Sequence, residues 1–178
     1  MEKKRKNTFS PPKRMIIIGI YEDPNKGILI VRNNNGGYQL PGGKIWRRTK
    51  PSQAQKQIQA EYNKITKIVF EKCGLSLDVQ NFMGLYNIKE STSKKFKLIK
   101  VVILKQNFKP ANKNWERLIQ FDADFMPADL EIIKEYYPKL PLTDWHILKE
   151  YFTLRNITLN NEDKNNELSY PLPLKIIA

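Results

Sequence analysis

The stretch from Pro51 to Leu75, PSQAQKQIQAEYNKITKIVFEKCGL, is the feature that most limits how this chain can fold. The apolar residues that recur in it with the period of one helix face are Ile58, Tyr62, Ile65 and Val69. Pro51 suits the first turn of a helix, and Gly74 suits the position just past its end. The sequence therefore predicts an amphipathic helix that must bury one face against other elements.

Apolar runs on both sides of this helix supply the surface against which it can pack. MIIIGIYE (15–22) and GILIVRN (27–33), joined by the turn DPNKG, predict two strands of a hairpin. After the helix, LDVQNFMGLYNI and FKLIKVVILKQNF also predict strands, and ADLEIIKEYYPKL and LTDWHILKEYFTL predict helices. The expected fold class is α+β.

The segment YQLPGGK (38–44) lies between the second strand and the helix. Proline lacks an N–H and glycine tolerates unusual backbone angles, so we expect regular structure to stop at Pro-Gly-Gly. Backbone N–H groups would then be open to a ligand.

Composition bounds the classes of protein to consider. The chain has 178 residues, one Cys and one His, which excludes an internal disulfide and a Cys-based or His-cluster metal site. No apolar run is long enough to span a membrane, and no apolar leader follows the basic start, so we expect an intracellular, cytoplasmic protein without a membrane partner. The net charge of +13 comes from residues 1–110, whereas residues 111–178 hold more acidic than basic side chains. A basic face of this kind attracts nucleotides or RNA, although a Lys- and Asn-rich genome would give the same balance without such a partner.

We expect three segments along the chain. Residues 1–14 form a flexible basic arm, residues 15–155 form one domain, and residues 156–178 form a polar linker with a short apolar tail that docks back on the domain. The two terminal segments could contact a protein partner.

YQLPGGK, followed by a helix that ends in FEKCGL, resembles the Nudix superfamily. The resemblance covers about residues 15–155 and implies a Nudix-like α/β/α sandwich with a mixed central sheet, the helix of the family's sequence box and C-terminal helices. It also implies hydrolysis of nucleoside diphosphates linked to another group, with Mg²⁺ or Mn²⁺ as cofactor. The box reads G, five residues, E, seven residues, R-E, an aliphatic, any residue, E-E, any residue, G, an aliphatic.

The box is degenerate in this chain. Gly43 and Gly74 match its first and last glycines, but they are about 10 residues farther apart than in the family pattern. The arginine and glutamate of R-E fall on Lys67 and Ile68, and the pair E-E falls on Glu71 and Lys72. Of the box acids at the helix end, only Glu71 is present.

The missing acids bear directly on metal binding. Mg²⁺ and Mn²⁺ need oxygen ligands, which Ile68 cannot give, and Lys72 would place a positive charge beside the metal. Glu61 is nearly three helical turns, about 15 Å, before Glu71 and cannot share a metal with it. If the chain is an active enzyme, Glu71 is its catalytic and metal-binding residue, helped by Glu90 or Glu116. The alternative for Glu71 is a surface pair with Lys67 four residues earlier.

Anion binding could persist without a metal, because lysine and arginine can neutralise a diphosphate. Glycine, basic and aromatic residues near the two motifs are the candidates for one ligand groove: Tyr38, Gly42, Gly43, Lys44, Trp46, Arg47, Arg48, Lys67 and Lys72. Solvated surface charges and strand or loop packing are the structural alternatives for these residues. We expect Cys73 to be a packing residue.

Three function classes remain open from the sequence. The first is a Nudix-like protein that binds a nucleoside-diphosphate-type ligand or an RNA 5′ end, with hydrolysis weak or lost and no cofactor. The second is an active, metal-dependent hydrolase of nucleoside diphosphate derivatives or capped RNA. The third is a structural or interaction subunit, for example in a ribonucleoprotein.

Overall fold

The structure, a computed structural model, describes residues 13–47, 54–89, 96–107, 123–136, 140–162 and 175–177. Its elements in chain order are β1 (Lys13–Ile20), β2 (Glu22–Asp23), β3 (Gly27–Arg32), β4 (Tyr38–Gln39), β5 (Gly42–Arg47), α1 (Ala54–Cys73), β6 (Leu77–Lys89), β7 (Phe96–Gln106), β8 (Ala123–Met126), α2 (Leu130–Tyr136), α3 (Leu142–Glu162) and β9 (Lys175–Ile177). The α+β class is confirmed, as are the helix ending at Cys73, the two long strands after it and the two later helices.

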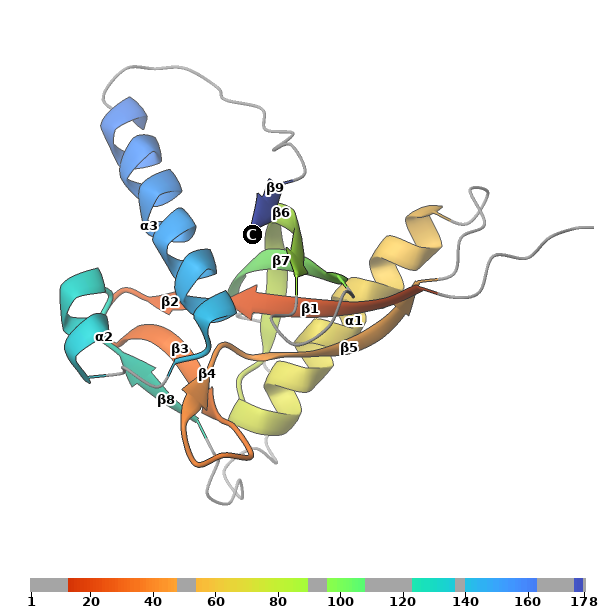
Figure 1. Cartoon of the computed structure of the whole chain (residues 1–178), viewed down its shortest axis with the longest axis horizontal. Coiled ribbons are helices and arrows are strands. Elements are labelled where there is room, and N and C mark those ends of the chain that lie inside the picture. The colour runs from red at the N-terminus through yellow and green to blue at the C-terminus, as the bar shows by residue number, and fades with distance from the viewer. Residues whose placement is uncertain are drawn as a thin grey trace, which may run out of the picture.

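The strands form two sheets, shown in Figure 1. The larger sheet is five-stranded and mixed, in the order β5-β1-β7-β6-β9, with β1 parallel to β7 and antiparallel to β5. The smaller sheet has the order β2-β3-β4, with β8 also pairing with β3.

The predicted hairpin between residues 15–22 and 27–33 is largely wrong. Only the short β2 pairs with β3, through Glu22↔Ile28 and Asp23↔Gly27, while β1 pairs with β5 and β7 in the other sheet. The reason lies in burial, because Ile17 and Ile18 point to opposite faces and both are buried. A strand that is apolar on both faces belongs inside a covered sheet.

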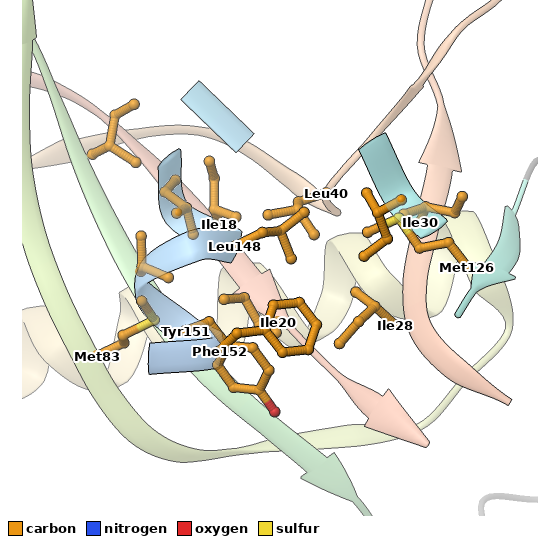
Figure 2. Packing of buried hydrophobic residues seen from close by; sticks show 14 of the residues in the cluster. Ile18, Ile20, Ile28, Ile30, Leu40, Met83, Met126, Leu148, Tyr151 and Phe152 are labelled. Carbon is orange, nitrogen blue, oxygen red and sulfur yellow. The ribbon is translucent and has the colours of Figure 1, made fainter. Parts of the chain in front are cut away.

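Two apolar cores lie on the two faces of the sheets. One core joins Ile65, Val69 and Cys73 of α1 to strand residues that include Ile17 and Ile45. In the other, shown in Figure 2, Leu148, Tyr151 and Phe152 of α3 pack against Ile18, Ile20, Ile28, Ile30, Leu40, Met83 and Met126. The sheets therefore lie between α1 on one side and α3 on the other, which confirms the α/β/α sandwich.

The buried stripe of α1 differs from the predicted one in its first turns. Ile65 and Val69 are buried as expected, but Ile58 is 43% exposed although it lies in line with Ile65. The first turns of α1 therefore extend beyond the apolar surface that covers the rest. The helix ends as predicted, because Gly74 has a φ of 65° and its N–H donates to the carbonyl of Phe70 at 2.9 Å.

The described elements reach beyond residues 15–155 at both ends. β1 begins at Lys13, and α3 continues past residue 155 to Glu162, projecting away from the sheets (Figure 1). The backbone of β9 pairs in parallel with residues 86–88 of β6. None of the helices in the described ranges is long and apolar enough to cross a membrane.

Candidate functional site

Regular structure is interrupted at Leu40 and Pro41, between the end of β4 at Gln39 and the start of β5 at Gly42. The expectation that regular structure stops is therefore wrong for the two glycines, which belong to β5. Gly42 begins β5 and lies opposite Ile18 of β1, and Gly43 lies opposite Ile17. A Cβ atom on Gly42 would lie 2.6 Å from the carbonyl oxygen of Ile17, and one on Gly43 would lie 2.6 Å from Cδ1 of Ile68. Gly42 is therefore required by close packing against the β1 backbone, whereas a side chain at position 43 would need Ile68 to shift.

The ladder between β1 and β5 decides which backbone groups a ligand could reach. Gly19 N–H donates to the carbonyl of Pro41 at 2.9 Å, which makes that residue pair a hydrogen-bonded one. Because pairs alternate in an antiparallel ladder, the Gly43 N–H points toward β1, whereas those of Gly42 and Lys44 point away from it. The outer edge of β5 thus presents two N–H groups beside the α1 surface.

Ile68 occupies the place where α1 meets β5. Its side chain is 7% exposed and faces Gly43. At the other end of the contact, Gln57 donates to the carbonyl of Trp46 at 3.3 Å, so α1 runs antiparallel to β5. Lys72, one turn after Ile68 on the same helix side, is exposed and lies toward the Gly42 end of β5.

Glu71 forms the surface pair that was the alternative interpretation of this residue. Its carboxylate lies 3.6 Å from the ammonium of Lys67, and both side chains are more than half exposed. Such exposed pairs contribute little to stability. Lys67, Glu71 and Lys72 therefore form a solvated, net positive end of α1.

The side chains that are described do not assemble a set of metal ligands. No three His, Cys, Asp or Glu residues in the described ranges lie close enough together to hold a metal ion. Glu90, Glu116 and Arg48 lie outside those ranges, and Arg47 is placed by its backbone alone. At the box positions on α1 the structure therefore offers one carboxylate, that of Glu71, which does not fit the oxygen-rich coordination of Mg²⁺.

The remaining candidate residues do not lie with Lys67 and Lys72. Gly43 and Ile45 face α1, so the alternation of the strand directs Lys44 and Trp46 to the opposite face of the sheet. Tyr38 packs at the edge of the α3 core. The structure thus places the residues of the predicted ligand groove on two separate faces, one on the α1 side and one on the opposite side of the sheet.

A buried ion pair beneath α1 is a feature that we did not predict. Lys100 of β7 lies 2.6 Å from Glu61 of α1, and both side chains are less than a tenth exposed. Gln57 donates to the same carboxylate at 3.1 Å. The rings of Tyr62 and Phe82 lie 5.0 Å and 5.6 Å from the Lys100 ammonium, so aromatic faces complete its surroundings.

The sequence contained a signal for this pair. In FKLIKVVILKQ, Lys100 has the same strand parity as the apolar Leu98 and Val102, so it had to point into the core. Glu61 precedes Ile65 by four residues and so belongs to the buried stripe of the helix. A lysine and a glutamate that both point into one core are expected to pair, because a buried charge needs an opposite charge.

Asp144 fixes the backbone that leads into β5. Its carboxylate accepts the N–H of Leu40 at 2.7 Å and is buried at the start of α3. Burial raises the pKa of Asp144 to about 7, while the hydrogen bond from Leu40 acts in the opposite direction. Burial also raises the pKa of Cys73 to about 11, as suits the expected packing residue.

Solved structures that superpose on this arrangement of sheets and helices include a Nudix hydrolase. A Nudix hydrolase from Nitrosomonas europaea superposes with a TM-score of 0.52 at 16% identity, over 81% of this chain and 90% of that chain. The chain has the Nudix fold. The E. coli ORF135 protein gives a TM-score of 0.50 at 17% identity over 81% of this chain and 91% of its own, and an ADP compounds hydrolase gives 0.50 at 13% over 83% and 76%.

Comparison of the sequence alone finds no match to a known family or protein. No family model matches the chain, and no curated protein matches it. At identities this low the likeness establishes the Nudix fold and leaves the activity to be argued from the site.

Proposed function

We propose that this Nudix-fold protein binds a nucleoside-diphosphate-type ligand, free or as an RNA 5′ end, and that its metal-dependent hydrolysis is weak or lost. The observation that supports this best is Ile68, buried against Gly43 at the box position where the family has a glutamate. A hydrocarbon side chain there offers no oxygen to a metal.

The α1 side of β5 retains groups that suit a diphosphate. Lys67 and Lys72 are exposed at the end of α1, and the N–H groups of Gly42 and Lys44 point outward from the strand edge. Charge-assisted hydrogen bonds from ammonium and backbone N–H groups to phosphate oxygens need no metal. One structural neighbour is named an ADP compounds hydrolase, so ADP-ribose is the first ligand to try.

Isothermal titration of ADP-ribose into the protein in EDTA tests the binding. We expect measurable affinity that Lys72→Glu lowers at least tenfold, because a cation facing the diphosphate becomes an anion. Lys134→Glu, an equal charge change on exposed α2, is the matched control and should leave the affinity unchanged. If both variants lost the same affinity for ADP-ribose, the net charge of the protein would explain the loss, and the proposal would be contradicted.

Hydrolysis assays test the second half of the proposal. ADP-ribose, capped RNA and dinucleoside polyphosphates should stay uncut in Mg²⁺ or Mn²⁺. Metal-dependent cleavage that Glu71→Gln abolishes would instead establish an active enzyme, with Glu90 or Glu116 completing the metal site.

A further inference from the structure

The face of the large sheet opposite α1 carries an exposed aromatic ring between basic side chains. Trp46 on β5 is 63% exposed, although tryptophan is among the most highly buried residues on average. Arg14 lies directly across from it on β1, and its guanidinium carbon is 5.9 Å from the centre of the indole. An exposed indole held beside a cation calls for an account other than core packing.

Strand alternation places further positive charge on the same face. Lys44 is two residues before Trp46 and exposed, and Met15 and Leu98 pack on the α1 side, so Arg14 and Lys97 point away from α1. Arg14 and Lys97 belong to adjacent strands, since Met15 pairs with Leu98. The residues of β5, β1 and β7 that share this face include no acid: residues 42, 44, 46, 14, 16, 18, 20, 97, 99, 101 and 103.

The helices and strands of the described ranges leave this part of the sheet uncovered. In Figure 1, α1 lies behind the N-terminal end of β1 and the C-terminal end of β5, whereas α3 crosses the sheet near the opposite end of β1. The exposed fraction of Trp46 agrees with this view. We name the surface formed by Arg14, Lys44, Trp46 and Lys97 the sheet platform.

We propose that the sheet platform binds a single-stranded nucleic acid, with a base stacked on Trp46 and the backbone phosphates on Arg14 and Lys44. Exposed aromatic rings beside cations are the chemistry that binds single strands, because every base has a face to stack and every nucleotide a charge to neutralise. The platform lies on the other side of β5 from the Gly43–Ile68 contact. It is therefore a second site, and the proposal stands whether or not the α1 side of β5 binds ADP-ribose.

Fluorescence anisotropy with labelled oligo(U) of about 12 nucleotides tests the platform. We expect Trp46→Ala to weaken binding at least fivefold, the loss expected for one stacked base, and Trp46→Phe to weaken it less. Phe70→Ala, which removes an exposed aromatic from α1, is the matched control and should change the affinity by less than about twofold. A Trp46→Ala affinity within about twofold of the wild type would overturn the proposal.

Salt dependence tests the phosphate contacts separately. Arg14→Gln and Lys44→Gln should each lower the slope of log K against log salt by about 0.7, the value for one phosphate contact to a single strand. Lys134→Gln and Lys64→Gln, which remove exposed charges on α2 and α1, should leave the slope unchanged. Equal slope changes in all four variants would assign the binding to the net charge of the chain and overturn the proposal.

A competition assay and a measurement of molar mass separate the platform from other surfaces. A duplex of the same length hides its base faces and should compete poorly, so equal competition would overturn the stacking contact. Light scattering of wild type and Trp46→Ala should give the same molar mass, since dissociation by the variant would make the platform an interface between copies of this chain.

Discussion

At the scale of residues, two ion pairs of α1 show how burial decides what a charge contributes. Lys67 and Glu71 are 3.6 Å apart and largely exposed, so water competes for both charges. Lys100 and Glu61 are 2.6 Å apart and almost fully buried, so each is the only opposite charge that the described contacts give the other, beside the Gln57 amide and the rings of Tyr62 and Phe82. The exposed pair can be changed at little cost, whereas the buried pair holds α1 on β7.

Lys100→Met should lower the free energy of unfolding by about 3–5 kcal/mol, because it leaves the Glu61 carboxylate buried without its cation. Urea unfolding measures the loss. Lys105→Met, at an exposed position near the end of the same strand, is the control and should stay within about 0.5 kcal/mol of the wild type. The double change Lys100→Met with Glu61→Leu should recover most of the stability. A single variant as stable as the control would show that the pair is not structurally important.

At the scale of elements, the contact between β5 and α1 depends on the absence of a side chain. Gly43 lets Ile68 lie on the strand, and Gly42 lets the backbone of β5 lie close to β1. The first contact involves the end of a side chain and the second a backbone oxygen. The two glycines should therefore respond differently to a compensating change in α1.

Gly43→Ala should cost about 1–3 kcal/mol, because its Cβ would lie 2.6 Å from Cδ1 of Ile68. Ile68→Val removes that atom, so the double variant should lose less than the sum of the single changes. Gly42→Ala should gain nothing from Ile68→Val, since its clash is with the Ile17 carbonyl. Chemical unfolding of the five variants measures the coupling, and additive losses for Gly43→Ala and Ile68→Val would contradict the packing described.

The link between α3 and the segment before β5 should make stability depend on pH. The pKa of Asp144 rises from 3.8 to about 7 on folding, so the folded state binds the extra proton between these values. The contribution of this group to the free energy of unfolding is then full below pH 3.8 and is lost as the pH rises to about 7.

Asp144→Asn keeps an oxygen for the Leu40 N–H and removes the titration. Relative to the wild type, we expect this variant to gain about 2–4 kcal/mol between pH 4 and pH 8, measured by urea unfolding across the range. Asp129→Asn, an exposed carboxylate that caps α2, is the control and should show no such gain. If the difference in the free energy of unfolding between wild type and Asp144→Asn did not change with pH, the pKa of Asp144 would be at its ordinary value.

At the scale of the whole molecule, the period of apolar residues was enough to predict the longer elements and the α+β class, because burial of one face dictates that period. The sandwich was predicted from the resemblance to the Nudix superfamily. Strand partners could not be predicted in the same way. The turn after Asp23 suggested a hairpin, but β1 is apolar on both faces and pairs with the distant β7. From the sequence, Gly42 and Gly43 were assigned to a ligand. Their close contacts with Ile17 and Ile68 are set by tertiary packing, which the sequence does not show.

Two features of the candidate residues follow from the sequence, whereas their arrangement in space does not. The replacement of acids by Ile68 and Lys72 can be counted from Gly74, and the pairing of Glu71 with Lys67 follows from helical spacing. Lys44 and Trp46 lie on the sheet face opposite Lys72 because of the register in which β5 pairs with β1. No local sequence pattern reveals that register.

We propose that a Nudix fold here retains a phosphate-binding surface without a metal centre. A crystal structure grown with both ADP-ribose and Mn²⁺ tests it most directly, because ligand and metal are separate outcomes. We expect ADP-ribose with its diphosphate at Lys72 and the Gly42 edge of β5, and no Mn²⁺ at Glu71. Mn²⁺ held by Glu71 together with Glu90 or Glu116 and bridging the diphosphate would contradict the claim.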